Sequence, residues 1–103
     1  MRDKLLVTLM KIVELLTSCG ERTRAEWFRG RLEVLKSERL ESKKFQEVIH
    51  ELHGVLAGMG SLSDLSLNPA PTSGLTRQEA RNQQWDLVED LDEAISGLLV
   101  DMR

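Results

Sequence analysis

The chain has 103 residues, of which 41% are hydrophobic and 30% charged, and its formal net charge is −3. This length and composition predict one globular domain with a single core, and they exclude a wholly disordered chain. The single cysteine excludes an internal disulfide, and we expect a cytoplasmic protein with no signal peptide and no membrane span.

The first predicted helix covers about residues 2–19. Apolar residues recur in it at helical spacing, and a buried stripe is expected at Leu5, Leu9, Ile12 and Leu16. Nine apolar residues between positions 5 and 16 exceed what one buried face requires, so we expect this helix at the centre of the fold. Gly20 is expected to close the helix in a left-handed conformation.

Two further helices are predicted at about residues 23–37 and 42–57. The second begins with Thr23-Arg24-Ala25-Glu26, which matches a capping box in which the threonine and the glutamate bond two free backbone N–H groups. Ser42 is expected to cap the third helix. Gly54 interrupts the apolar pattern of that helix, and it predicts either a close helix crossing or fraying.

Residues 58–75 are predicted to be irregular, because they contain both prolines and three of the seven glycines. The last helix, at about 76–102, begins with a second capping box, Thr76-Arg77-Gln78-Glu79. Its core stripe is expected at Trp85, Val88, Leu91, Ile95, Leu98 and Leu99, close to a heptad seam. The four segments together predict an all-α, up-and-down four-helix bundle with an irregular loop before the last helix.

Charge is distributed unevenly along the chain. Residues 1–60 carry eleven Lys/Arg and nine Asp/Glu, whereas residues 61–103 carry three and eight. This acidic C-terminal part argues against a nucleic acid ligand. Four carboxylates of the last helix share one face, although like charges at this spacing repel: Asp86, Glu89, Asp90 and Glu93.

Two explanations of this acidic face remain open at the level of sequence. Arginines of the second helix could neutralise it within the fold, and the candidates are Arg22, Arg24, Arg29 and Arg31. Alternatively, the face binds a basic protein partner. Trp27 and Trp85 lie at the edges of their apolar stripes, where tryptophan serves either the core or an interface, and the core is favoured for both.

No group of residues predicts a metal site or a catalytic centre. Glu47 and His50 have the Glu-x-x-His spacing of di-iron bundles, but a second such motif is absent. We therefore interpret His50 and His53 as residues of a solvated helix face. Cys19 lies near a helix end whose dipole disfavours a thiolate. We expect no cofactor and no enzymatic activity.

The segment Gly58-Met59-Gly60-Ser61 has the glycine density of a phosphate-binding loop. It lacks the third glycine, the lysine and the preceding strand that such loops require. Termination of the third helix accounts for the glycines equally well. We therefore interpret Gly58, Met59, Gly60, Ser61 and Asp64 as a shaped structural turn.

The segment Gly58-Met59-Gly60-Ser61, with Asp64 and Leu65, resembles a group of small, uncharacterised bacterial proteins. In that group a Gly-Gly-Met-Gly-Ser-x-Asn-Asp-Leu stretch follows two or three helices. Ala57 and Ser63 depart from the pattern. The resemblance is loose over residues 5–67, and it excludes the acidic last helix. It implies a bacterial helical protein and carries no activity, but small acidic proteins of this kind often accompany secreted toxins as immunity proteins.

The leading hypothesis is a non-enzymatic protein-binding module, an immunity-type inhibitor that neutralises a basic toxin domain. Its expected partner-binding residues are Trp27, Trp85, Asp86, Glu89, Asp90 and Glu93. A first alternative is a self-assembling helical protein, a homodimer formed through the last helix. A second alternative is a small-ligand-binding domain that uses the Gly58–Asp64 turn. No nucleic acid or membrane partner is expected.

Overall fold

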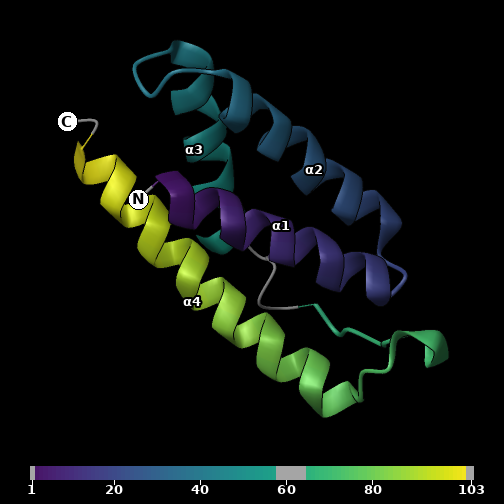
Figure 1. Cartoon of the computed structure of the whole chain (residues 1–103). Helices are drawn as coiled ribbons and strands as arrows, with labels where there is room; N and C mark the ends of the chain where they lie inside the picture. The colour runs from purple at the N-terminus through teal and green to yellow at the C-terminus, as the bar shows by residue number, and fades with distance from the viewer. Residues whose placement is uncertain (1, 58–64, 102–103) are drawn as a thin grey trace.

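A computed structural model shows a four-helix bundle in residues 2–57 and 65–101, the part of the chain that the structure describes (Figure 1). The helices are α1 (Arg2–Ser18), α2 (Arg22–Ser37), α3 (Lys43–Ala57) and α4 (Arg77–Asp101), and a 3₁₀ turn, η2 (Pro71–Ser73), precedes α4. The described residues contain no strand. The predicted all-α class is confirmed, and each helix begins and ends within one residue of its predicted position.

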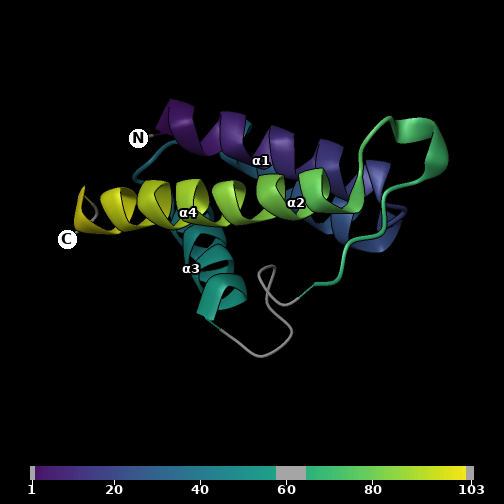
Figure 2. The same ribbon diagram turned by 90° about the horizontal axis from the view of Figure 1, so that it is seen from below.

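The helix α1 is the central element. It packs against α2 on one side and α4 on the other, and it runs antiparallel to both (Figure 1). The helix α3 packs against α2 and α4 and crosses the other helices steeply (Figure 2). A Cβ atom on Gly54 of α3 would meet nothing within 4 Å, so the close helix crossing considered for this glycine is wrong. Among the described residues, no helix is both long and apolar enough to cross a lipid bilayer.

The core draws on all four helices. Its largest fully buried side chains are Leu5, Leu9, Ile12, Leu16, Leu35, Phe45, Ile49, Leu52, Leu91 and Ile95. The stripe predicted for the first helix, Leu5, Leu9, Ile12 and Leu16, is therefore confirmed. Each stripe recurs at three or four residues, so one face of every helix can be removed from water.

The turn between α1 and α2 lies one residue earlier than the sequence predicts. Gly20 has φ +74°, and the Glu21 N–H donates to the Leu16 carbonyl at 2.9 Å, which is the bonding of a glycine-closed helix end. The next helix begins at once, so Thr23 already lies inside its first turn. The predicted capping box is wrong: Glu21 is the N-cap residue and makes no side-chain cap bond, and Glu26 bonds Arg29 instead.

Side chains close the two ends of the turn between α2 and α3. The Arg2 guanidinium donates to the carbonyl of Leu35 at 2.8 Å and to that of Glu38 at 3.1 Å. These carbonyls would otherwise lack a partner at the end of α2. Ser42 caps α3 as predicted, because its Oγ accepts the Phe45 N–H at 3.0 Å.

The extended segment that leads into α4 is fastened to the bundle. The Ala70 N–H donates to the Ser18 carbonyl at 2.9 Å, and the Gln84 amide donates to the Leu65 carbonyl at 2.9 Å. Leu67, which lies between Leu65 and Ala70 in the chain, is buried. The irregular structure predicted here is confirmed for residues 65–75, apart from the short turn η2.

The second capping box is present as predicted. The Thr76 N–H donates to Glu79 Oε1 at 3.0 Å, and the Glu79 N–H donates to Thr76 Oγ1 at 3.1 Å. Hydrogen bonds from Thr76 to the Glu79 carboxyl lower the pKa of that carboxyl, the bond from the backbone N–H first and the bond from the hydroxyl second. The ionised form of Glu79 is therefore the form that the capping box at the start of α4 favours.

The predicted stripe of α4 is confirmed at Leu91, Ile95 and Leu98, and the buried stripe departs from the prediction in the N-terminal half of the helix. The buried stripe consists of Ala80, Gln84, Leu87, Leu91, Ala94, Ile95 and Leu98. Trp85 is 48% exposed, so its assignment to the core is wrong. The cause is Gln84, a polar residue that takes a core position because the Leu65 carbonyl satisfies its amide. A prediction based on the spacing of apolar residues omits a buried glutamine and assigns the neighbouring tryptophan to the core instead.

Candidate functional site

The outward face of α4 carries the four carboxylates that the sequence placed together. Asp86, Glu89 and Glu93 are exposed, and Asp90 is half-buried. All four lie away from the buried stripe of the helix, so packing does not explain their presence. We refer to Asp86, Glu89, Asp90 and Glu93 as the acidic face.

One cation from α1 reaches the acidic face. Lys4 Nζ lies 2.8 Å from Glu93 Oε2. Among the described residues, no other ion pair involves a carboxylate of the acidic face. Most of its charge is therefore uncompensated in this part of the chain, which makes the face electrostatically attractive to a basic surface.

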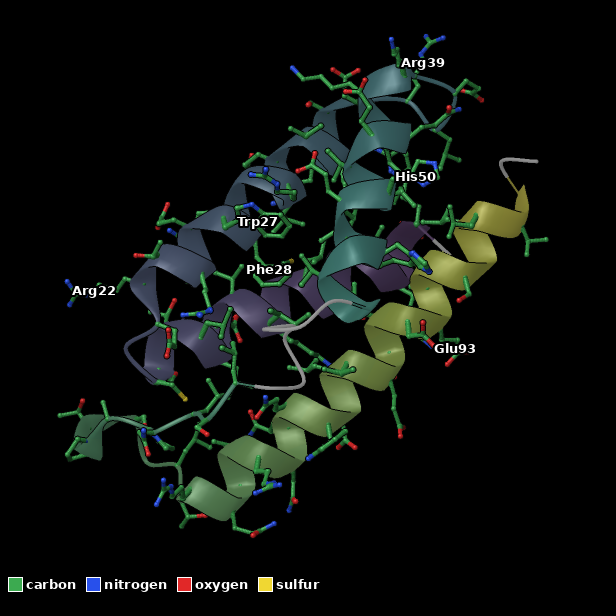
Figure 3. All side chains as sticks on the ribbon, turned by 180° about the vertical axis from the view of Figure 1, so that it is seen from behind. Arg22, Trp27, Phe28, Arg39, His50 and Glu93 are labelled. Atoms are coloured by element: carbon green, nitrogen blue, oxygen red, sulfur yellow. The ribbon has the colours of Figure 1, made fainter. Side chains whose placement is uncertain are left out.

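The arginines of α2 do not neutralise the acidic face. Arg24 pairs with Glu21, Arg29 with Glu26 and Arg31 with Glu51 of α3. Arg22 makes no ion pair with a described residue, and Figure 3 shows it on the far side of α1 from Glu93. Neutralisation of the acidic face is thus wrong for the three arginines that pair elsewhere. Lys4, the cation that does pair with this face, was not among the predicted candidates.

A groove of about 440 Å³ lies between α1 and α4, beside the acidic face. Apolar side chains line it together with polar ones, and the apolar ones are Leu15, Leu75 and Leu87. Asp86 and Asp90 border it from α4, and Lys11 and Glu14 border it from α1. The groove therefore combines carboxylates with apolar surface, a combination found in protein interfaces.

Two exposed apolar side chains stand on the outward face of α1. Val7 is 50% exposed and Met10 is 46% exposed. The first helix has more apolar residues than its central position buries. This excess was the feature of the sequence that could have indicated exposed apolar side chains. Both side chains belong to the helix that packs against α4 (Figure 1), although neither lines the groove.

The two tryptophans do not belong to one site. Trp27 lies on α2, across α1 from the acidic face (Figure 3). Its ring packs edge-on against Phe28 with centroids 5.0 Å apart, and the Arg31 guanidinium lies 4.1 Å from its ring centroid. Arg31 in turn bonds Glu51 of α3 at 2.8 Å, so Trp27 contacts the side chain that links α2 to α3. Trp85 lies on α4 and is exposed.

The remaining candidate residues are distributed over the molecule. Gly58, Met59, Gly60, Ser61 and Asp64 lie outside the described residues. His50 and His53 are exposed on α3, as interpreted from the sequence. Cys19 is half-buried at the end of α1, and burial, followed by the nearby Glu21 carboxylate, raises the pKa of its thiol.

Within residues 2–57 and 65–101, no three His, Cys, Asp or Glu side chains gather as metal ligands would. The structure thus keeps the predicted acidic residues of α4 together on one face and places an apolar-lined groove beside them. Comparison with known proteins adds no relative, because no family model, curated protein or solved structure is significantly similar to this chain.

Proposed function

We propose that the protein is a non-enzymatic binding module that neutralises a basic protein, an immunity-type inhibitor of a bacterial toxin. The observation that carries this proposal is the acidic face, whose carboxylates have one cationic partner, Lys4, among the described residues. Helical surfaces that serve solubility alone mix both signs of charge, since like charges one turn apart repel. A basic partner would remove that repulsion on binding.

Complementary charge accounts for how such a module associates. Uncompensated carboxylates accelerate encounter with a basic surface, and salt weakens this effect. The groove beside Asp86 and Asp90 and the exposed side chains of Val7 and Met10 supply apolar area that slows dissociation. An inhibitor of this kind acts by covering a basic active-site cleft, and its own surface needs no catalytic group.

A homodimer through the last helix is the second candidate function, and the fold weighs against it. The apolar seam expected to join two copies includes Leu91, Ile95 and Leu98, which are buried in the bundle. A symmetric dimer on the outward side would place the acidic face against its own copy. Sedimentation velocity separates the two hypotheses, since we expect a monomer over the micromolar range.

The proposal is tested by measuring the kinetics of binding between this protein and the protein encoded by the reading frame adjacent to its own. We expect co-expression to rescue cells from toxicity of that product, and we expect a fast, salt-sensitive association rate. The triple variant D86K/D90K/E93K should reduce the association rate about tenfold or more at low salt.

The matched control reverses three exposed carboxylates outside the candidate surface, in the variant E33K/E41K/E47K. It changes the net charge by the same amount, so it separates local complementarity from overall charge. Equal losses of association rate in both variants would contradict a binding role for the acidic face. A neighbouring product that is neither toxic nor bound would contradict the inhibitor function itself.

A further inference from the structure

A second hollow lies near the start of α4. It has a volume of about 380 Å³, within the range of small-molecule sites. The extended chain at Leu65–Leu67 forms one wall, and the helix forms the other with Arg77, Gln78, Arg81 and Trp85. We call it the arginine pocket.

The two guanidiniums of the arginine pocket belong to one helical row. Arg77 and Arg81 are one turn apart, so their Cα atoms are separated by about 6 Å along the axis. Neither makes an ion pair or a side-chain hydrogen bond with a described residue. The carboxylate of Glu79 accepts the Thr76 N–H and makes no ion pair with either arginine.

Helix stability does not account for this placement. Arg77 lies in the first turn of α4, where the helix dipole disfavours a cation. Apart from Glu79 in the first turn, the acidic residues of the same helix follow later, and its last turn holds no basic residue, so most of its charge order is the reverse of the favourable one. Positions that oppose local stability are often functional.

Trp85 continues the row by one more turn. Its side chain is 48% exposed, and its neighbour Gln84 occupies the core position instead. An exposed indole beside two guanidiniums offers a flat face for a planar ring. The pocket therefore presents two kinds of contact in sequence along the helix, cationic and then aromatic.

We propose that the arginine pocket binds a phosphate monoester carried by a planar ring, the chemistry of a nucleoside monophosphate. The phosphate lies between Arg77 and Arg81, and the ring stacks on Trp85. A guanidinium group can donate two parallel hydrogen bonds to the oxygens of one phosphate. A monoester carries about −1.5 to −2 charges at neutral pH, which matches two arginines better than a single carboxylate does. This site is separate from the acidic face and does not depend on the proposed function.

The two tryptophans allow a direct test by fluorescence. In the variant Trp27→Phe, Trp85 is the one remaining tryptophan of the chain. We expect AMP to quench its emission in a saturable manner. In the matched variant Trp85→Phe, which retains Trp27, AMP should leave the emission unchanged. Calorimetry of AMP binding to the unaltered chain gives the affinity independently of either substitution.

Three ligands separate the contributions of charge and ring. AMP should bind at least about tenfold more tightly than inorganic phosphate or adenosine, since each of these keeps one of the two contacts. Equal affinity for AMP and inorganic phosphate would overturn the stacking on Trp85. Heat from AMP that does not saturate in the millimolar range would overturn the site as a whole.

Arginine variants identify the anion contact. R77Q/R81Q should weaken AMP binding about tenfold or more, because a charge-assisted hydrogen bond to each guanidinium is lost. The control R22Q/R39Q removes two exposed arginines from other parts of the surface and should leave the affinity unchanged. Similar losses in both variants, or no loss in R77Q/R81Q, would overturn the proposal.

Discussion

Lys4 Nζ lies 2.8 Å from Glu93 Oε2, and this ion pair joins the first turns of α1 to the acidic face of α4. The side chains are 35% and 63% exposed, so water and salt screen their attraction. The pair therefore contributes little to the packing of the two helices. Its larger effect is to reduce the negative charge at one end of a face whose other carboxylates lack a described cationic partner.

Replacement of Lys4 by methionine tests this interpretation. We expect the free energy of unfolding to fall by less than about 1 kcal/mol, because exposed ion pairs contribute little. Urea denaturation at low and high salt measures the change, and the difference should shrink as salt rises. A double-mutant cycle with Glu93→Gln isolates the pair. A coupling above about 2 kcal/mol would show that the pair is structural.

The two Thr-Arg-x-Glu motifs of the chain give a matched test of helix capping. Thr76→Ala should destabilise the protein by about 1 kcal/mol, since it removes a bond to the Glu79 N–H. Thr23→Ala removes no capping bond, because α2 begins before this residue. Its effect should stay within about 0.5 kcal/mol. Equal losses in the two variants would contradict the assignment of Glu21 as the N-cap of α2.

The capping box also predicts a pH dependence. Hydrogen bonds from Thr76 lower the pKa of Glu79 in the folded state, so ionised Glu79 favours folding. This contribution is complete above the ordinary glutamate pKa and is lost as the pH falls through the lowered value. Thermal unfolding should show the unaltered protein losing its advantage over Glu79→Gln in that acidic range. An advantage that persists at still lower pH would contradict this mechanism.

The sequence predicted the helices because their apolar residues recur at helical spacing and their ends carry recognisable residues. Gly20, Ser42 and Thr76 all perform their predicted roles. The motif at Thr23 failed because a local pattern does not show that α1 closes at Gly20 and that α2 begins directly after Glu21. A capping box concerns the residues of one helical turn. The position at which α2 begins depends instead on the preceding turn, which closes α1.

The candidate site was predictable in part for a related reason. Carboxylates that share a helix face can be read from spacing, so the acidic face was found. Its partner Lys4 and the groove beside it depend on which helices pack together, and spacing within one helix carries no such information. Gln84 shows the same limit in the core, because its burial depends on a carbonyl nineteen residues earlier in the chain.

The corrected stripe of α4 predicts a contrast between two substitutions. Leu91 is fully buried, so Leu91→Ala should cost about 2–5 kcal/mol of stability through lost burial and the cavity left behind. Trp85 is half open to solvent, and Trp85→Ala should cost clearly less despite removing a larger side chain. Chemical denaturation of both variants measures the contrast. A larger loss for Trp85→Ala would restore tryptophan to the core.

Cys19 supplies a chemical test of the end of α1. Burial and then the Glu21 carboxylate raise the pKa of its thiol, so little thiolate forms at neutral pH. Iodoacetamide should therefore alkylate the folded protein more slowly than a free cysteine, and the rate should rise with pH beyond the range where a free thiol levels off. Glu21→Gln should increase the neutral-pH rate modestly, and unfolding in urea should restore the rate of a free thiol. Folded protein that reacts at the free rate would place Cys19 in open solvent, away from the half-buried position that the end of α1 gives it.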